Sequence, residues 1–416
     1  MIIERALAER LDAADPLAAF RDRFALGGDD QLIYLDGNSL GRPPKATLER
    51  LRALFEEEWQ GRLIRGWAEW IELARRAGDV IAGGVVEARP GEVVVSDSTT
   101  VNLYKLAVAA LDARPGRTVI VTDDDNFPTD QYVFAGLAEA RGLRVRKIRT
   151  DIDAGVSLAD VSAALDDTVA LVSLSHVAYR SGAIADMAGI TAAAHEAGAL
   201  VLWDLSHSAG SVPVPLNSAN VDLAVGCTYK HLNGGPGAPA FLYVREDLHT
   251  QLRQPIWGWF GQRDQFEMGN DYQPADSIER FLVGTPPVPG LYGALEGAGI
   301  TAEAGIDAIY AKAQSLTELM VTLHDAWLAP LGFTLASPRD AAQRGAHVTL
   351  HHKQAWQVCQ AWQARGSSRT SGPRNGCGSG RRRSTPGTRT STTASRGCAT
   401  WSRPANTTRS RPSAPG

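Results

Sequence analysis

Hydrophobic residues in the first part of the chain fall into short continuous runs separated by helical patterns. Six runs predict strands: VVVSDS (93–98), TVIVTD (118–123), VALVSLSH (169–176), ALVLWD (199–204), VDLAVGCT (221–228) and APAFLYV (238–244). Helices are predicted at 101–111, 130–142 and 191–198. Strands that are apolar on both faces and alternate with helices are typical of a parallel sheet covered on both sides. The pattern therefore predicts an α/β fold whose large domain contains a mostly parallel sheet covered by helices.

The regions before residue 93 and after residue 244 predict further helices, and the last of these helices leads to a second, smaller domain. We expect a short amphipathic helix and a loop over 1–30, a short strand and a turn over 32–44, two helices over 45–82, and one long helix over 301–328. The predicted domains are an N-terminal segment (1–45), a large cofactor-binding domain (46–300), part of a small α+β C-terminal domain (301–365) and a tail (366–416).

Charge is distributed unevenly along the 416 residues, although a composition of 44% hydrophobic and 21% charged residues is that of a globular protein. The last 51 residues hold ten Arg and no acidic residue, so the preceding 365 carry a net charge of −14. An acidic body argues against a nucleic acid as the main partner. The four cysteines show neither metal-ligand nor disulfide spacing, and no apolar run is long enough to span a membrane. We therefore expect a cytoplasmic protein without a metal ion or a membrane partner.

Polar residues stand at the carboxyl ends of the predicted strands, where parallel sheets bind their ligands. These residues are Ser98, Thr99, Asp123, Ser175, Asp204 and Lys230. In DSTTVNL (97–103) a strand passes into a helix, and free N–H groups at a helix start, with the hydroxyls of Thr99 and Thr100, suit a phosphate. The same residues also fit an ordinary helix cap without a ligand.

Acidic and aromatic residues on neighbouring loops fit a flat heterocyclic ligand. Asp204, in WDLSHSAG (203–210), can hold a proton on a ring nitrogen, and His207 follows three residues later. Phe127, in DDDNFPTDQY (123–132), can stack on a ring, and Asp130 can form a hydrogen bond with the same ligand. Each acid also fits a helix cap, so none of these residues identifies the ligand alone.

The lysine of GCTYKHLNGGPG (226–237) is harder to explain as a structural residue. Lysine is seldom buried, yet Lys230 follows a strand-like run and precedes three glycines and a proline within seven residues. A lysine desolvated at a strand end loses its proton more readily and can form a Schiff base. The adjacent Tyr229 offers a hydroxyl for a phosphate or for proton transfer. A purely structural Lys230 would instead extend its amine to the surface.

The order of these elements indicates a cofactor. A phosphate turn, an aromatic residue, the strand-end Asp204 and a lysine 26 residues later are the arrangement of pyridoxal phosphate enzymes of the aspartate-aminotransferase fold class, fold type I. Pyridoxal phosphate needs an anchored phosphate, a sandwiched ring, a protonated pyridine nitrogen and a lysine that forms an imine.

The chain resembles the kynureninase family through six motifs over about residues 30–350. The motifs are LDGNSLGRPP (35–44), NFPTDQY (126–132), WDLSHSAG (203–210), CTYKHLNGGPG (227–237), GWFG (258–261) and GTPP (284–287). The resemblance implies cofactor contacts from Thr99, Thr100, Phe127, Pro128, Thr129, Asp130, Ser175, Asp204, His207, Tyr229 and Lys230. It also implies a homodimer in which Trp259 and Thr285 reach the cofactor of the other subunit. Asn38 and Ser39 are expected beside the substrate.

By this resemblance, the chain is expected to be a hydrolase that cleaves the Cβ–Cγ bond of L-kynurenine, or of its 3-hydroxy form. The products are anthranilate, or 3-hydroxyanthranilate, and L-alanine, in tryptophan degradation and NAD precursor synthesis. The catalytic residues would be Lys230, which removes the α-proton, Asp204, which keeps the ring nitrogen protonated, and Tyr229, which donates a proton later. Two alternatives stay open. One is another fold-type-I enzyme, such as a cysteine desulfurase or a class-V aminotransferase; the other is an inactive protein that retains the cofactor.

The tail departs from the family. Kynureninases carry a segment that resembles R-F-G-x-x-P-L-Y, whose arginine binds the substrate α-carboxylate, and this chain has no such segment. Residues 366–416 contain ten Ser, nine Thr and eight Gly but no Leu, Ile, Val, Phe, Met or Tyr, a composition that predicts disorder. Codons for GSSRTSG (366–372) and CGSGRRRST (377–385) can be regrouped in one shifted frame to encode V-I-P-D-F-R and R-F-G-S-P-P-L-Y. We therefore expect the tail to be an out-of-frame translation.

Overall fold

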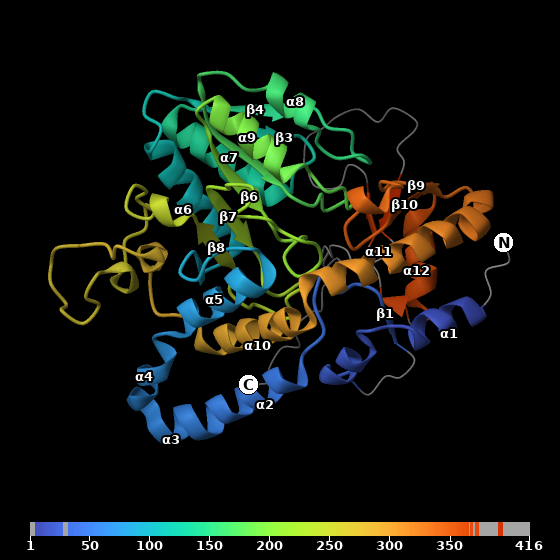
Figure 1. The fold of residues 1–416 in the computed structure, drawn as a ribbon, viewed down its shortest axis with the longest axis horizontal. Helices are drawn as coiled ribbons and strands as arrows, with labels where there is room; N and C mark the ends of the chain where they lie inside the picture. The colour runs from blue at the N-terminus through green and yellow to red at the C-terminus, as the bar shows by residue number, and fades with distance from the viewer. Residues whose placement is uncertain (1–4, 28–31, 366, 369–370, 374–389, 394–416) are drawn as a thin grey trace, which may run out of the picture.

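The computed structural model describes residues 5–27 and 32–365, with three short stretches of the tail at 367–368, 371–373 and 390–393 (Figure 1). Its centre is a seven-stranded sheet in the order β2-β8-β7-β6-β5-β3-β4. The strands are β2 (Val93–Val95), β3 (Val119–Asp123), β4 (Arg144–Ile148), β5 (Val169–Ser175), β6 (Leu200–Asp204), β7 (Leu223–Gly226) and β8 (Phe241–Val244). All run parallel except β8, which is antiparallel to both of its neighbours. The predicted α/β fold with a mostly parallel sheet is confirmed.

All six predicted strands are present, but the sequence pattern does not predict one edge of the sheet. β4 has the sequence RVRKI, in which charged and apolar residues alternate, and only Ile148 is buried. It therefore lacks the doubly apolar pattern of the central strands. Helix α8 (Leu158–Ala163) is also unpredicted because its six residues are too few for a clear periodicity. The direction of β8 could not be predicted, since an apolar run carries no sign of its direction.

Helices pack against the sheet and bring its strand ends into position (Figure 1). α6 (Thr99–Asp112) contacts β5 to β8, and α7 (Pro128–Arg141) contacts α6 and β4. α9 (Met187–Glu196) contacts β6 and α8. The long α10 (Val288–Ala304) packs along α5 (Leu73–Val85).

Two predicted helical regions are broken in the structure. Instead of two continuous helices, the region 45–82 contains α2 (Lys45–Ala53), a π-helical turn (Leu54–Trp59), α3 (Gln60–Arg62), α4 (Trp67–Trp70) and most of α5. The helix predicted over 301–328 is divided, because Gly305 has a φ of 79° and separates α10 from α11 (Ile306–Leu323). A positive φ interrupts a helix, and glycine adopts it without steric cost.

A smaller unit follows α11. Its sheet has the order β12-β13-β10-β9, formed by β9 (Thr334–Leu335), β10 (Thr349–His352), β12 (Ser371–Pro373) and β13 (Thr390–Thr393), and α12 (Ala355–Gln363) lies beside it. The described core of this unit is Val321, Phe333, Val348 and Leu350, whereas the large core extends from Leu54 to Ala298. β1 (Ile33–Tyr34) pairs with β11 (Ser367–Ser368). The other tail residues lie outside the described part, so the disorder predicted for 366–416 and the domain boundaries stay predictions.

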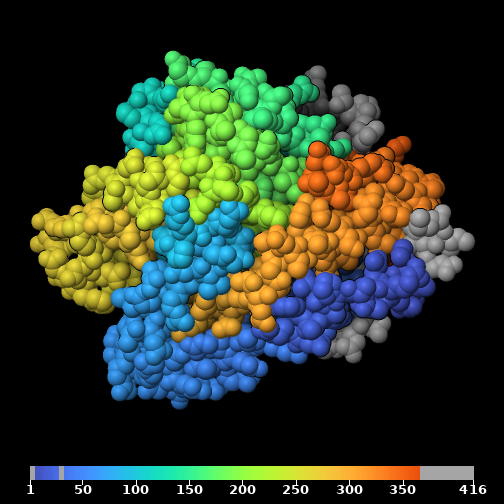
Figure 2. All heavy atoms as spheres, in the orientation of Figure 1, coloured from blue at the N-terminus to red at the C-terminus, as the bar shows by residue number. Residues whose placement is uncertain are grey.

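The N-terminal segment lies along α10 and α11, where Figure 2 shows its atoms directly against those of the two helices. Arg23 pairs with Glu303 at 2.9 Å, and Lys312 forms an ion pair with Asp15. This segment, which begins with α1 (Arg5–Ala13), leads through β1 into the GNSLG turn (37–41). These contacts therefore help to position that turn.

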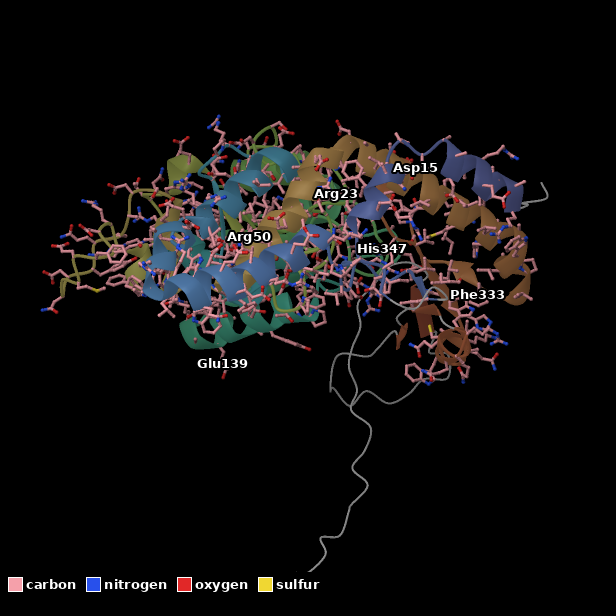
Figure 3. All side chains as sticks on the ribbon, turned by 90° about the horizontal axis from the view of Figure 1, so that it is seen from below. Asp15, Arg23, Arg50, Glu139, Phe333 and His347 are labelled. Carbon is pink, nitrogen blue, oxygen red and sulfur yellow. The ribbon has the colours of Figure 1, made fainter. Side chains whose placement is uncertain are left out.

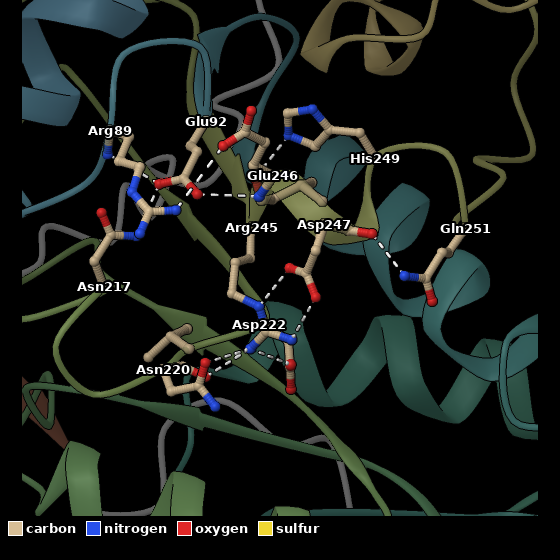
Figure 4. A network of polar contacts seen from close by, with 12 residues as sticks. Arg89, Glu92, Asn217, Asn220, Asp222, Arg245, Glu246, Asp247, His249 and Gln251 are labelled. Carbon is tan, nitrogen blue, oxygen red and sulfur yellow. Dashed lines mark hydrogen bonds and ion pairs between the residues drawn. The ribbon is translucent and has the colours of Figure 1, made fainter.

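A network of polar contacts stabilises the end of the sheet that lies opposite to the carboxyl ends of the parallel strands (Figure 4). Asp222, just before β7, is 1% exposed, and its carboxylate accepts a hydrogen bond from Val201 N at 2.9 Å. It also pairs with Arg245 at 3.0 Å and with His195 at 2.8 Å. Arg245 follows β8 and pairs with the exposed Asp247 at 2.6 Å. The network joins β6, β7 and β8 at this end of the sheet, so the carboxyl ends of the parallel strands stay available for ligands.

We expect Asp222→Ala to lower the free energy of unfolding by about 3 kcal/mol, because it removes the buried acceptor of Val201 N and the buried partner of His195 and Arg245. Asp247→Ala is the matched control. Asp247 pairs with the same Arg245, but its side chain is 59% exposed, so its loss should cost at most about 1 kcal/mol. Chemical denaturation followed by tryptophan fluorescence measures both changes. Equal losses for the two variants would contradict the role given to Asp222.

Candidate active site

A cavity of about 760 Å³ lies at the carboxyl ends of the parallel strands. It brings together eleven of the residues predicted from the sequence: Ser39, Thr99, Thr100, Phe127, Thr129, Asp130, Ser175, Asp204, His207, Tyr229 and Lys230. The predicted residues that do not line it are Asn38, Pro128, Trp259 and Thr285. Residues from several strand ends and from the GNSLG turn thus meet at one place, as expected for a sheet of this topology.

The start of α6 forms one wall of the cavity. Ser98 is the N-cap, and its Oγ accepts a hydrogen bond from Val101 N at 3.3 Å. Because Ser98 caps the helix, Thr99 and Thr100 line the cavity without being needed for the cap. The first N–H groups of a 14-residue helix and two threonines therefore meet there, an arrangement that suits a phosphate.

Lys230 reaches the cavity from a turn that follows β7. The residue is 5% exposed, and its Nζ lies 2.9 Å from Nε2 of His207 and 5.8 Å from the centre of the Phe127 ring. Burial, with a smaller effect from Lys230, lowers the pKa of His207 well below its ordinary value, so this imidazole is neutral. The lysine amine thus lies between a neutral ring and an aromatic ring. In such a desolvated setting a lysine can form a Schiff base.

Two glycines allow neighbouring backbone to pack tightly against this turn. Gly41 N donates to Tyr229 O at 2.9 Å, and a Cβ on Gly41 would lie 2.4 Å from Lys230 O. On α10, a Cβ on Gly297 would lie 1.9 Å from Leu232 O. Neither position has room for a side chain. The GNSLG turn therefore supports the backbone of Lys230, in addition to the contact with the cavity made by Ser39.

Two carboxyl groups lie together on the cavity wall. Burial, and then the charge of Asp204, raises the pKa of Asp130 well above its ordinary range. Two carboxyl groups in contact do not readily ionise together, so Asp130 is the member that keeps its proton. Asp204 Oδ1 accepts a hydrogen bond from Ser206 N at 2.7 Å. Oδ2 of Asp130 is buried and has no hydrogen-bond partner among the described residues.

Phe127 is fixed by an aromatic and a polar neighbour. Its ring packs edge-on against Tyr179, with the ring centres 5.4 Å apart. Oδ1 of Asn126 accepts hydrogen bonds from Phe127 N at 2.8 Å and from Ser175 Oγ at 2.9 Å. Tyr179, which also lines the cavity, has no role in the sequence-based prediction because no motif marks it. Pro128 is the first residue of α7 and sets the direction of the helix instead of lining the cavity.

The small unit places a buried histidine near the same site, and Figure 3 shows it where the two units meet. His347 is fully buried, and its ring centre lies 5.8 Å from that of His207. Burial lowers the pKa of His347 to about 4, so it is neutral. A hydrogen bond from Gly345 N to Gly182 O, 2.7 Å long, ties this segment to the large domain. No sequence motif indicates His347, because only the packing of the two units brings it to the site.

Three predicted site residues lie away from the cavity. Trp259 packs against Trp67 and Phe260, with ring centres 6.5 Å and 4.4 Å away, and Thr285 is exposed. Both residues are expected to act across a dimer interface, so their distance from this cavity agrees with that expectation without testing it. Asn38 is fully buried, and neither atom of its amide has a hydrogen-bond partner among the described residues.

Comparison with known proteins assigns the family. The family model for aminotransferase class-V matches residues 33–357. A kynureninase from Pseudomonas fluorescens is 43% identical over 364 residues, which cover 86% of this chain and 85% of that protein. A kynureninase from Burkholderia pseudomallei (strain K96243) is 43% identical over 369 residues, covering 87% and 86%. The chain belongs to the kynureninase family. The resemblance carried by the six motifs is therefore confirmed.

Solved structures add support for the fold alone. The apo cysteine desulfurase from Thermococcus onnurineus NA1 matches with a TM-score of 0.72 at 20% identity, covering 88% of this chain and 87% of that one. The cystine C–S lyase C-DES, in complex with its product cysteine persulfide, matches with a TM-score of 0.73 at 17% identity, covering 89% and 95%. The kynureninase family therefore shares its architecture with enzymes that act on other substrates.

We expect pyridoxal phosphate to form a Schiff base with Lys230, the cavity lysine. After borohydride reduction, mass spectrometry of peptides should place the phosphopyridoxyl group there. Lys230→Ala should lose both the visible imine absorbance and the adduct, whereas exposed Lys147→Ala should keep both. Lys105, also buried, should remain unlabelled because its Nζ is paired with Asp97 at 2.6 Å. A reducible adduct in Lys230→Ala would show that the assignment is wrong.

Proposed function

We propose that the protein is a pyridoxal phosphate-dependent hydrolase that cleaves the Cβ–Cγ bond of L-kynurenine, or of 3-hydroxykynurenine. It thus acts on a carbon–carbon bond of a ketonic substrate. The observation that carries the proposal is the 43% identity to kynureninases over 86% of the chain. The meeting of Lys230, Asp204, Phe127 and the start of α6 in one cavity supports it. The reaction belongs to tryptophan degradation and supplies NAD precursors.

The residues of the cavity fit pyridoxal phosphate. The start of α6 suits the phosphate, the Phe127 ring suits the face of a pyridine, and the carboxyl group of Asp204 suits a protonated ring nitrogen. Lys230 supplies the amine for the aldehyde. The free Oδ2 of buried Asp130 offers one more polar contact. A volume of about 760 Å³ lies within the range of cofactor pockets.

Lys230, Asp204 and Tyr229 each have a separate role in the proposed reaction. When bound, the cofactor supplies an electron sink for the negative charge that develops at the substrate Cα. Lys230, as a free amine, removes the proton from Cα, with neutral His207 at 2.9 Å as its neighbour. Asp204 keeps the ring nitrogen protonated. After water adds to the γ-carbonyl and the Cβ–Cγ bond breaks, Tyr229 is the proton donor of the later steps.

Two other fold-type-I activities are less well supported. A cysteine desulfurase needs a nucleophilic cysteine on a mobile loop. Cys227 is 3% exposed, and its Sγ lies 3.7 Å from Ser206 O. Burial raises the pKa of its thiol and disfavours the thiolate. A class-V aminotransferase would share the fold and the cofactor, but the relatives with 43% identity are kynureninases.

We also propose that the protein acts as a homodimer in which Trp259 and Thr285 complete the cofactor site of the other subunit. Large apolar side chains are exposed close to these residues and on the helices before α5: Phe55, Trp59, Leu63, Ile64, Trp257, Phe266 and Met268. Such a concentration on one domain suits burial against a second copy.

The cytoplasm is the proposed location. No helix in the described part of the chain is long and apolar enough to cross a membrane. Cys227 is a free and buried cysteine. A free buried cysteine and the absence of a disulfide spacing in the sequence suit a reducing compartment.

For the tail, we propose that residues from about 366 onward are translated out of frame. The match to the family model ends at residue 357, shortly before the composition changes. The main apolar cluster of the small unit is small and contains four buried residues in the described part of the chain. Codons chosen for residues 377–385 can be regrouped in a shifted frame to encode R-F-G-S-P-P-L-Y, and its arginine would be the guanidinium partner for the substrate α-carboxylate. We therefore expect the present chain to keep the cofactor site with little activity, and its frame-restored form to be the efficient hydrolase.

We expect the nucleotide sequence around codons 360–370 to contain a single-base insertion or deletion whose repair restores R-F-G-S-P-P-L-Y. The frame-restored chain should release anthranilate from L-kynurenine and melt at a higher temperature, because its small domain buries more apolar surface. The present chain should be nearly inactive. If no single-base change in that region restores the motif, the tail is genuine and this proposal fails.

In the frame-restored chain, Asp204→Asn should lower kcat for L-kynurenine by about a thousandfold, or about 4 kcal/mol, because an amide cannot hold the pyridinium proton. Asp130→Asn is the matched control and should lower kcat by less than about tenfold, since an amide resembles the protonated acid already present there. Anthranilate fluorescence measures both rates, and melting curves check folding. Equal losses would remove the distinction between the two acids, and no anthranilate from the parent enzyme would refute the proposed activity.

A further inference from the structure

Lys105 lies outside the cavity but contacts two segments that serve it. The residue is on α6 and is 0% exposed. Its Nζ lies 2.6 Å from Oδ2 of Asp97 and 2.7 Å from the backbone oxygen of Phe281. Desolvating an ammonium is unfavourable, and apart from Asn102 the other buried residues of α6, such as Leu103 and Leu106, are apolar. A purely structural position there would suit another apolar residue.

Asp97 is the first of these segments. It has a φ of 50°, which a non-glycine residue seldom adopts, and its backbone oxygen accepts a hydrogen bond from Ala240 N at 2.9 Å. Asp97 lines the cavity beside Thr99 and Thr100, where the phosphate is expected. A lone carboxylate next to a phosphate would repel it. The Lys105 ammonium neutralises Asp97 and holds it in this conformation.

The second segment begins at Phe281 and belongs to a larger surface unit. Val283 O accepts a hydrogen bond from Phe260 N at 3.2 Å, and a Cβ on Gly258 would lie 2.0 Å from the same oxygen. Residues 258–261 and 281–285 are therefore packed together, and we call them the partner-facing unit. Trp259 and Thr285 both belong to it.

We infer that Lys105 is a positioning residue that couples two parts of its own subunit. One part is the phosphate turn of its own cofactor site, and the other is the partner-facing unit, which completes the cofactor site of the second subunit. The inference rests on the proposed cofactor and homodimer. Binding of a phosphate fixes the turn that starts at Asp97. Through the ammonium, the same event fixes the Phe281 carbonyl and the segment after it. The cofactor of each subunit thereby orders the residues that complete the other site.

Hydrogen–deuterium exchange of the full chain, with and without pyridoxal phosphate, tests this coupling. In the parent protein the cofactor should slow exchange at 98–102 and also at 282–285. Lys105→Met should weaken cofactor binding by about tenfold and abolish the protection at 282–285. Exposed Lys147→Met is the matched control and should change neither.

The double variant Asp97→Asn/Lys105→Met separates the effect of charge from that of positioning. It also removes the unpaired carboxylate that destabilises the single variant. It should regain cofactor affinity to within about threefold of the parent, because no lone charge faces the phosphate. Protection at 282–285 should stay lost. Protection at 282–285 that persists in both variants, or that is absent from the parent while 98–102 is protected, overturns the coupling. No protection at 98–102 in the parent overturns the cofactor site itself, and the role of Lys105 with it.

Discussion

Close backbone contact around the Lys230 turn is the constraint on which the site depends. Asn233 N donates to Lys230 O at 3.0 Å, and Gly234 N donates to Thr228 O at 2.8 Å, so the turn is closed by its own hydrogen bonds. Gly41 packs on one side of it and Gly297 of α10 on the other. Gly41 and Gly297 therefore allow the GNSLG turn, the Lys230 turn and α10 to pack directly against one another. Since the backbone of the turn is fixed by them, Nζ of Lys230 has a defined place beside His207.

The electrostatics of the cavity follow from its burial. His207 and His347 are neutral, Asp130 is protonated, and the pKa of the Cys227 thiol is raised. Burial is the main cause of each shift, because removal of water penalises the charged form. Asp204 lies beside Asp130 and can pair with a cationic ring. A carboxyl group at that place is what a cofactor with a protonated ring nitrogen requires.

Much of this site could be predicted from the sequence because its residues come directly after strands. An apolar run followed by a polar residue marks a strand end, and parallel strands bring such ends to one edge. The family resemblance added the roles of Asn38, Ser39, Trp259 and Thr285. Tyr179, His347 and Lys105 could not be predicted, since long-range packing alone brings them to the site. The break in the helix predicted over 301–328 could not be predicted either. Gly305 is one of many glycines in the sequence, and only its positive φ in the structure interrupts the helix.

The central claim is that the cofactor site forms without the tail being in frame, whereas substrate cleavage needs the in-frame small domain. One paired measurement tests it: imine absorbance with pyridoxal phosphate, and anthranilate release from L-kynurenine, for the present chain and the frame-restored chain side by side. We predict imine absorbance in both and anthranilate release from the frame-restored chain alone. Equal anthranilate release from the two chains, or no imine absorbance in the present chain, would contradict the claim.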